Sequence, residues 1–271
     1  MLLTVDGHPA YAYTGGKPFD ATLPTVVFIH GAQHDHSVWI LQSRYLAHHG
    51  YGVLALDLPG HGRSGGPALS TVEAIAQWVV ALLDAAGVQQ AALVGHSMGS
   101  LVAVEIAGTA PDRVGRVALV GSAFPMKVAD PLLDATRDDE RLAQDMVNIW
   151  SHSTYAAKPS SPGPGFWING QNLRLMQRIA PGVMHVDFKA CNDYAQGLTR
   201  AASIACPSLF ILGGRDAMTP PRAARELQAA IKGQRTVLVS ASGHNLMAEQ
   251  PDAVLDALSG FLKEKARDAR A

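Results

Sequence analysis

A serine framed by glycines is the feature of this sequence that could most directly do chemistry. Ser97 stands at the centre of the pentapeptide 95–99 (GHSMG), after the apolar run 91–94 and before the helix-like segment 100–108. A strand that turns sharply into a helix needs small flanking residues, because the two backbones pass close together, and it pushes the central side chain out at the tip. The free N–H groups of the helix N-terminus lie beneath that tip. The pattern predicts a nucleophile whose attack on a carbonyl creates an oxyanion.

Two further residues could complete the chemistry that Ser97 begins. A serine hydroxyl needs a general base, and the base needs an orienting partner. His244 follows the last predicted strand and Asp216 follows the strand before it. Both would therefore stand at the carboxyl edge of the sheet, where Ser97 also emerges. Asp130 is a rival for the acid, but it lies well beyond the end of the preceding strand, so Asp216 is preferred.

Apolar runs alternate with helical patterns along most of the chain. Runs such as 25–30 and 52–57 are typical of strands buried on both faces of a parallel sheet. Residues 1–16 instead indicate an antiparallel hairpin around the turn 6–9. The alternation predicts an α/β fold with a mostly parallel, doubly wound sheet. Further strands are expected at 91–95, 116–121, 207–212 and 235–239, and helices at 38–49, 71–86, 220–231 and 250–265.

The stretch 123–205 breaks this rhythm. It has helical patterns at 131–150 and 171–179, a Ser/Pro/Gly-rich loop at 158–165, and no convincing buried strand. We interpret it as a helical lid, or cap, inserted between two strands of the sheet. The core domain would then consist of residues 1–122 and 206–271.

Composition and charge exclude several other classes. The chain has 271 residues, of which 48% are hydrophobic, enough for one large core or a core with an insertion. A formal net charge of −1 provides no electrostatic attraction to nucleic acid or to an anionic membrane surface. No segment has the pattern of a signal peptide or a membrane span, and Cys191 and Cys206 lack metal-ligand spacing. We expect a soluble cytoplasmic protein with a small-molecule substrate, and we allow for a homodimer.

These motifs together resemble those of the α/β-hydrolase fold superfamily across nearly the whole chain. The resemblance is carried by the segments 30–32, 57–64 and 95–99 and by the pair 214–216 and 243–244. It implies an eight-stranded-type sheet, with Ser97, Asp216 and His244 as a catalytic triad. It also implies that the backbone N–H groups of Ala32 and Met98 form the oxyanion hole. Such donors typically contribute about 3 kcal/mol each to stabilising the charged oxygen.

The nucleophile type narrows the chemistry that the resemblance implies. Haloalkane dehalogenases and epoxide hydrolases of this superfamily use an aspartate where this chain has Ser97, which argues against both. The serine members include carboxylesterases, lipases, lactonases, thioesterases, cofactor-free perhydrolases and the C–C hydrolases of aromatic meta-cleavage products. The C–C hydrolases usually carry asparagine where this chain has His96, and a Gly/Pro-rich loop where it has 32–34. A non-catalytic ligand receptor of the same fold is a further alternative, which the presence of all three triad residues disfavours.

The preferred reading is a serine hydrolase that cleaves carboxylic esters with small to medium acyl or alcohol groups through an acyl-enzyme. No metal or organic cofactor is expected. C–C hydrolysis and perhydrolysis on the same triad are the alternatives. The inserted lid should set specificity. Within it Trp150 and Trp167, and at its start Met126, are candidates for contacting substrate, although such residues more often form the core of a lid. Gln33 and His34, beside the oxyanion loop, are the other candidates.

Overall fold

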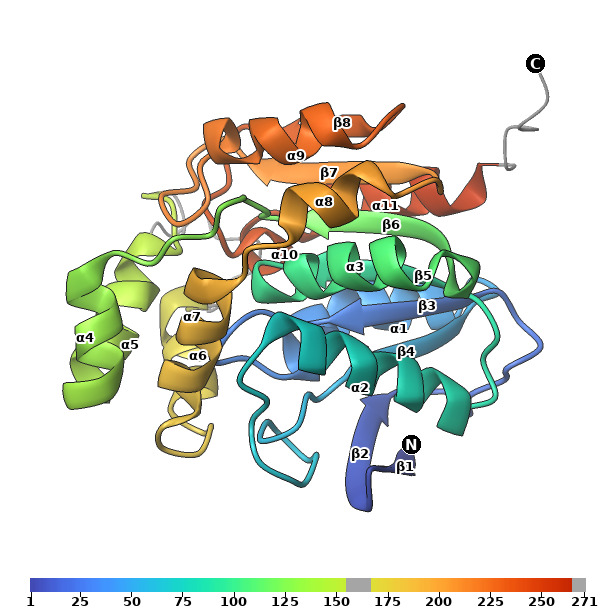
Figure 1. Cartoon of the computed structure of the whole chain (residues 1–271), viewed down its shortest axis with the longest axis horizontal. Coiled ribbons are helices and arrows are strands. Elements are labelled where there is room, and N and C mark those ends of the chain that lie inside the picture. Colours follow the sequence, from blue (N-terminus) through green and yellow to red (C-terminus); the bar gives the residue numbers. More distant parts are fainter. Residues whose placement is uncertain (155–166, 265–271) are drawn as a thin grey trace.

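A central sheet organises the computed structural model, which describes residues 1–154 and 167–264 (Figure 1). Its strands are β1 (Leu2–Val5), β2 (His8–Tyr13), β3 (Thr25–Ile29), β4 (Gly52–Leu56), β5 (Ala91–His96), β6 (Val114–Val120), β7 (Ser208–Gly213) and β8 (Arg235–Val239). They lie in the order β1-β2-β4-β3-β5-β6-β7-β8. The β1–β2 and β2–β4 pairs are antiparallel, and all other neighbours are parallel. The predicted mostly parallel, doubly wound sheet is therefore confirmed.

The central strands lack the polar alternation of a half-exposed sheet because both of their faces are buried. Every residue of β3 and β4 is buried. Within β3, Val27 and Ile29 pack into one hydrophobic cluster, whereas Val26 and Phe28 pack into another on the opposite face. This division follows from the two-residue period of a strand. The edge strand β8 is different, since four of its five residues are exposed.

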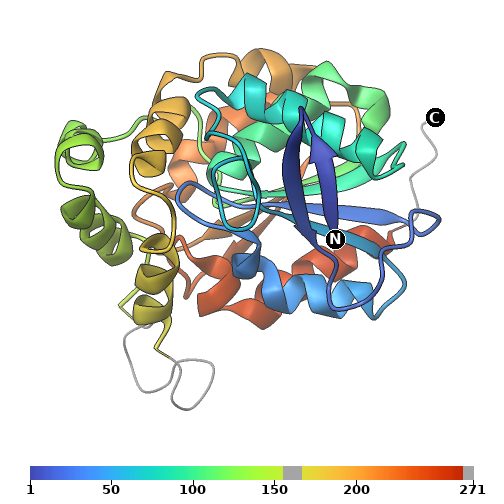
Figure 2. The same ribbon diagram turned by 90° about the horizontal axis from the view of Figure 1, so that it is seen from below.

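Helices cover both faces of the sheet. They are α1 (Ile40–Ala47), α2 (Val72–Ala85), α3 (Met98–Thr109), α9 (Arg225–Ala230), α10 (Leu246–Glu249) and α11 (Pro251–Lys263), with 3₁₀ turns η1 (His36–Trp39), η2 (Pro111–Arg113) and η3 (Pro221–Ala224). Figure 2 shows α2 and α3, in teal and green, on one side of the sheet, and α1 and α11, in blue and red, on the other. The helix predicted at 38–49 is split between η1 and α1.

In the described part of the insertion between β6 and β7, the structure has five further helices. They are α4 (Asp130–Asp138), α5 (Glu140–Trp150), α6 (Ile168–Met176), α7 (Val183–Asp193) and α8 (Gly197–Ala202). The parallel strands point toward α4–α7 (Figure 1), which share a hydrophobic cluster of their own. The last helix, α8, packs instead against α3 of the core. The loop predicted at 158–165 and the last residues of the predicted core domain, 265–271, lie outside the described residues.

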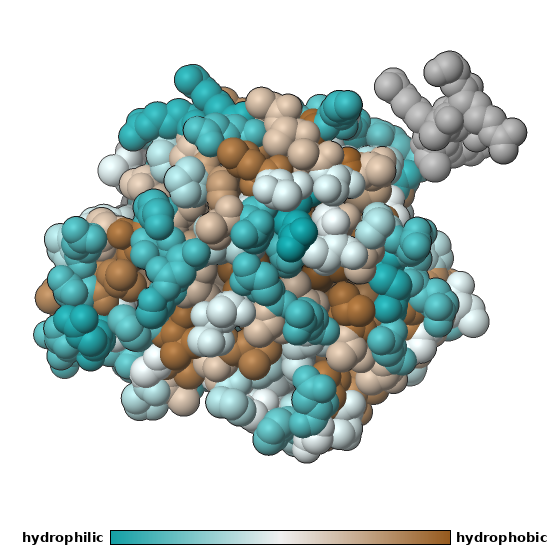
Figure 3. All heavy atoms as spheres, in the orientation of Figure 1, coloured by the Kyte–Doolittle hydropathy of each residue, from teal (hydrophilic) through white to brown (hydrophobic). Residues whose placement is uncertain are grey.

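The surface carries mixed polarity. On the face seen in Figure 3, hydrophobic residues form small groups separated by hydrophilic ones. None of the helices within the described ranges is both long and apolar enough to cross a bilayer. The thiols of Cys191 and Cys206 are both free.

Candidate active site

Ser97 occupies the turn between β5 and α3, and its backbone is strained there. Its φ and ψ angles are 52° and −118°, in a region that residues with a side chain rarely adopt. The two glycines of the pentapeptide permit this turn. A Cβ added to Gly95 would lie 2.1 Å from the carbonyl oxygen of Gly99, and one added to Gly99 would lie 2.4 Å from that of Ile29. Both contacts are far below van der Waals distance, so no other residue type fits without moving the backbone.

Hydrogen bonds hold this strained turn in place. The backbone N–H of Ser97 donates to the carbonyl of Val120 at 3.0 Å. The carbonyl of Ser97 accepts from the N–H of Ser100 at 2.8 Å and from its hydroxyl at 2.6 Å. The Ser100 hydroxyl also contacts that of Ser122 at 2.8 Å. These contacts compensate for the unfavourable backbone angles and leave the Ser97 side chain at the N-terminus of α3.

The predicted base and acid lie against each other. His244, after β8, has its Nδ1 2.8 Å from Oδ2 of Asp216, which follows β7, and both side chains are buried. Because Asp216 offers an acceptor, the shared proton belongs to Nδ1 of His244, and Nε2 carries a lone pair in the neutral ring. Ser97 and His244 line the same cavity. The rival acid, Asp130, is exposed at the start of α4 and stands outside this lining.

Thr219, which was not predicted from the sequence, supports the acid. Its hydroxyl lies 2.8 Å from Oδ2 of Asp216 and 3.0 Å from Nδ1 of His244, and its N–H donates to Oδ1 of Asp216 at 2.7 Å. Burial alone would raise the pKa of Asp216, but the neighbouring His244 and the Thr219 hydrogen bonds outweigh it and lower that pKa. The carboxylate therefore stays ionised. An aspartate followed three residues later by threonine is a local turn signal, but its reach to His244 depends on the tertiary fold.

The loop that carries the base is fastened to the inserted helices. The carbonyl of Ser151, at the end of α5, accepts from the N–H groups of both His244 and Asn245, at 2.8 and 3.0 Å. On the other side, Nε2 of His96 donates to the carbonyl of His244 at 2.9 Å. Burial lowers the pKa of His96 well below its usual range, so its ring is neutral. His96 therefore supports the base through its backbone rather than exchanging protons with substrate.

Glu249 ties the same loop to the insertion from behind. Its Oε1 accepts from the N–H of Gly243 at 3.0 Å, and its Oε2 accepts from the N–H of Ser153 at 3.0 Å and the Ser153 hydroxyl at 2.5 Å. Burial raises the pKa of Glu249 despite these donors. Position 243 must be glycine, since a Cβ there would lie 2.7 Å from the backbone N of Ser153. The base loop and the insertion thus form one connected unit.

The loop 30–34 passes directly beside the nucleophile. A Cβ on Gly31 would lie 3.1 Å from that of Ser97, so glycine permits the close approach. The N–H of Met98, the first residue of α3, has no acceptor within the helix. Ala32 lines the cavity next to Ser97. The two proposed oxyanion donors therefore belong to two backbone segments that lie beside the nucleophile.

His30 orients the peptide that carries the Ala32 N–H. Its Nε2 accepts from the N–H of Leu58 at 3.1 Å, and its Nδ1 lies 2.8 Å from the carbonyl oxygen of Gly31. The proton is therefore on Nδ1, which donates to that carbonyl. Burial lowers the pKa of His30 well below its usual range, which keeps the ring neutral. Because the Gly31 carbonyl and the Ala32 N–H belong to one planar peptide, fixing the first aims the second.

A cavity of about 240 Å³ lies next to Ser97 and His244. Of the predicted substrate contacts, three further side chains line it: His34, Met126 and Trp150. The other two do not: Gln33 is fully buried and hydrogen-bonded to the insertion, and Trp167 is 72% exposed and absent from the lining. The lining also includes Lys127, Val147 and Met218, which were not predicted from the sequence.

His34 enters the cavity wall as a neutral ring. Its Nε2 lies 2.9 Å from Oδ1 of Asn172 in α6, whose Nδ2 in turn donates to Oδ1 of Asn148 at 3.1 Å. Nε2 therefore carries the proton. Burial lowers the pKa of His34 to about 4, and only part of that effect is offset by Asn172. A ring with this pKa is a poor general base at neutral pH, which leaves that role to His244.

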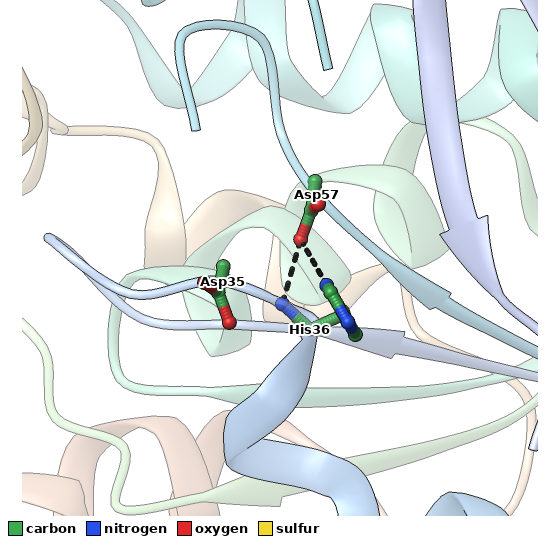
Figure 4. A group of neighbouring side chains, drawn as sticks. All are labelled: Asp35, His36 and Asp57. Atoms are coloured by element: carbon green, nitrogen blue, oxygen red, sulfur yellow. Dashed lines mark hydrogen bonds and ion pairs between the residues drawn. The ribbon is translucent and has the colours of Figure 1, made fainter. Parts of the chain in front are cut away.

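Within the described residues, Asp35, His36 and Asp57 form a cluster with the spacing of metal ligands (Figure 4). Several of their possible ligand atoms already have protein partners. Oδ1 of Asp57 accepts from the backbone N and from Nδ1 of His36, at 2.8 and 2.7 Å, and its Oδ2 accepts from the N–H of Arg63 at 2.8 Å. Asp35 caps the following 3₁₀ turn through Ser37. These contacts explain the cluster as a brace between the loops after β3 and β4.

The family model for the alpha/beta hydrolase fold matches residues 24–251. A putative carbamate hydrolase, RutD, of Klebsiella pneumoniae is 28% identical over 230 residues, which cover 82% of this chain and 84% of that protein. The (E)-2-((N-methylformamido)methylene)succinate hydrolase of Acinetobacter baylyi is 24% identical, over 88% of this chain and 90% of its own length.

Solved structures of similar fold cover nearly the whole molecule. The enol-lactonase from Burkholderia xenovorans LB400 has a TM-score of 0.86 at 25% identity, with 97% of this chain and 100% of that chain covered. An esterase from Exiguobacterium antarcticum has a TM-score of 0.85 at 18% identity, with 97% and 99% covered. The second likeness, at so low an identity, is one of fold alone.

Proposed function

This chain belongs to the α/β-hydrolase fold family and is a hydrolase, and we propose that it cleaves small to medium carboxylic esters through an acyl-enzyme on Ser97. The observation that carries the proposal is the buried hydrogen bond of 2.8 Å between His244 and Asp216. His244 lines the same cavity as Ser97, which stands on a strained turn. Such an arrangement is the standard means of activating a serine hydroxyl.

In the proposed reaction, Ser97 Oγ attacks the ester carbonyl as Nε2 of His244 takes its proton. Asp216 holds the imidazole tautomer and stabilises the imidazolium that forms. The N–H groups of Ala32 and Met98 donate to the carbonyl oxygen as it becomes negative. His244 returns the proton to the departing alkoxide, which releases the alcohol. Water, deprotonated by His244, then attacks the acyl-enzyme, and the carboxylic acid leaves as Ser97 recovers its proton.

The cavity and the insertion define the substrate size in this proposal. A volume of about 240 Å³ accommodates a small to medium acyl or alcohol group, and its lining exposes more apolar than polar surface. Trp150 from α5 and Phe188 from α7 contribute to that lining, so the inserted helices act as the lid that sets specificity. A cyclic ester fits the same mechanism, in keeping with the similarity to an enol-lactonase.

Carbamate hydrolysis is the second candidate, and the similarity to a putative carbamate hydrolase favours it. The same triad would attack a carbamate carbonyl, and His244 would protonate a departing nitrogen instead of an oxygen. C–C hydrolysis of meta-cleavage products and perhydrolysis are the remaining chemistries for this triad, and a ligand receptor is the non-catalytic alternative.

The test compares wild type, Ser97→Ala and Ser203→Ala on p-nitrophenyl esters of increasing acyl length. Ser203 is exposed on the distant α8 end and serves as the matched serine control. We expect a burst and turnover in wild type and in the control, and a loss of at least about a thousandfold in kcat for Ser97→Ala. Turnover of a lactone, a carbamate and a meta-cleavage product is measured in parallel, so that the rates of the candidate reactions can be compared. Turnover that survives in Ser97→Ala would refute the mechanism, and faster turnover of the carbamate than of any ester would replace the ester assignment.

A further inference from the structure

A carboxylate from the insertion reaches the loop that carries the proposed oxyanion donor. Asp187 lies in α7 and is 1% exposed. Its Oδ2 accepts from the backbone N–H of Gln33 at 2.8 Å and contacts Nε2 of His61 at 2.9 Å. One oxygen thus joins three segments that are far apart in the sequence: the loop after β3, the loop after β4, and α7.

The surroundings of His61 favour a protonated ring. Its Nδ1 lies 3.0 Å from the carbonyl oxygen of Pro59, and its Nε2 faces the Asp187 carboxylate. Both partners are acceptors, so both hydrogen bonds form only with the imidazolium, which carries a proton on each nitrogen. Burial alone would lower the pKa of His61, but Asp187, the Pro59 carbonyl and the more distant Asp57 outweigh it and raise that pKa. The neutral His30 ring also lies beside the His61 ring, with the two ring centroids 4.9 Å apart.

Gln33 needs this support because its backbone is strained. It has φ of 60°, in the left-handed region, and it immediately follows Ala32. Its side-chain amide also donates to the carbonyl of Met176, the last residue of α6, at 3.0 Å. The peptide before Ala32 is held by His30, as described above, and the peptide after it by Asp187. Together the two contacts leave the Ala32 N–H little freedom of direction.

We propose that Asp187, with protonated His61 as its counter-ion, is a positioning residue that couples the inserted helix α7 to the oxyanion hole. The proposal rests on the proposed function, since it concerns a donor used when Ser97 attacks a carbonyl. Its consequence is that the insertion does more than shape the substrate cavity: α7 helps to set the geometry in which charge develops. Oxyanion donors act at fixed distance and direction, so a small displacement of Ala32 lowers the rate of chemistry more than it lowers substrate binding.

The experiment compares Asp187→Ala and Asp187→Asn with Asp193→Ala. Asp193 is an exposed carboxylate on the same helix, paired with Lys189, so it controls for a lost charge on α7. The readouts are KM and the kcat per active site, where the number of active sites is titrated with a fluorophosphonate. A third readout is the Kd of a trifluoromethyl ketone, whose adduct with the serine needs the oxyanion hole. The Asn variant keeps an acceptor for the Gln33 N–H and tolerates a neutral His61, so it protects the test against a simple failure to fold.

We expect Asp187→Ala to lower kcat about tenfold to a hundredfold and to weaken the ketone by a similar factor, with KM changed less than about threefold. Asp187→Asn should fall between Asp187→Ala and wild type, and Asp193→Ala should match wild type. If kcat per active site is unchanged in both Asp187 variants, while only the melting temperature or the active fraction falls, then Asp187 is merely structural and the proposal is wrong.

A pH profile separates this role further. Because the pKa of His61 is raised in the folded protein, the charged pair is lost as the pH rises through that raised value. The wild-type kcat should fall on the alkaline side, and Asp187→Ala should lack this fall. If wild type hydrolyses no ester, the proposed function fails separately. In that case the positioning role is tested by the rate at which the fluorophosphonate labels Ser97. Slower labelling in Asp187→Ala than in wild type supports the role, whereas equal rates, or no labelling at all, refute it.

Discussion

The neutral, buried ring of His34 makes the protein sensitive to mild acid, and this sensitivity has a calculable size. An exposed histidine titrates near 6.5, whereas the pKa of His34 in the folded chain is lowered to about 4. Above pH 6.5 the ring is neutral in both folded and unfolded chains. Below it the unfolded chain gains a proton that the folded chain refuses, so the free energy of unfolding falls. At about 1.4 kcal/mol per pH unit, the loss from this one ring reaches about 3 kcal/mol by pH 4.

Replacing His34 with glutamine isolates this contribution. A glutamine amide can still donate to Asn172 but does not titrate. The free energy of unfolding is measured by urea denaturation at several pH values from 7.5 to about 4.5 for wild type, His34→Gln and His8→Gln, a control whose ring is exposed. Between pH 6 and 5 the stability of wild type should fall more steeply than that of His34→Gln, by about 1.4 kcal/mol per pH unit, the equivalent of one proton.

Other buried groups also change how the free energy of unfolding of the wild type depends on pH. They are present in His34→Gln as well, so their effects cancel in the comparison. His30 and His96, whose pKa values are lowered, add to the loss of stability at low pH. Glu249, whose pKa is raised, reduces that loss. Equal slopes for wild type and His34→Gln would refute the reasoning.

Three other substitutions test local features. Gly99→Ala should destabilise the fold by about 3 kcal/mol in urea denaturation, because its Cβ would meet a β3 carbonyl oxygen at 2.4 Å; a stable variant would contradict the tight turn. Thr219→Val should lower kcat about tenfold, since the acid beside His244 loses one hydrogen bond; an unchanged kcat would show that this hydroxyl is dispensable. Tyr194→Phe should cost about 1–3 kcal/mol of stability by removing a 2.7 Å donor from buried Glu105, which a thermal melt with unchanged Tm would disprove.

Local patterns were sufficient to predict most of the fold. The apolar runs around Val27 and Leu54 predicted buried parallel strands, because a strand covered on both faces has no polar positions. The sequence also indicated the insertion, since its helical patterns interrupt an otherwise regular alternation. It did not indicate that α8 leaves the other inserted helices and packs on α3. That choice depends on contacts such as the one between Arg200 and Glu105, which join positions far apart in the chain.

In the candidate site, too, some features were predictable from the local sequence and others depend on long-range contacts. Ser97, Asp216 and His244 were predicted from their neighbours because each follows a strand, and parallel strands bring their carboxyl ends to one edge. The contacts of Gln33 and Trp167 were not predictable in this way. Both were candidates for touching substrate, yet Gln33 is tied to the insertion and Trp167 faces solvent.

The sequence by itself determined the elements, their parallel arrangement and the three residues of the candidate triad, since these follow from hydrophobic period, turn chemistry and strand order. Only the tertiary structure decided which side chains share a proton or a carboxylate. The pKa of His61 is raised, whereas the pKa values of His30, His34 and His96 are lowered, because Asp187 on a distant helix contacts the His61 ring. Burial and long-range partners set the chemistry of a histidine, and neither is encoded in its immediate sequence.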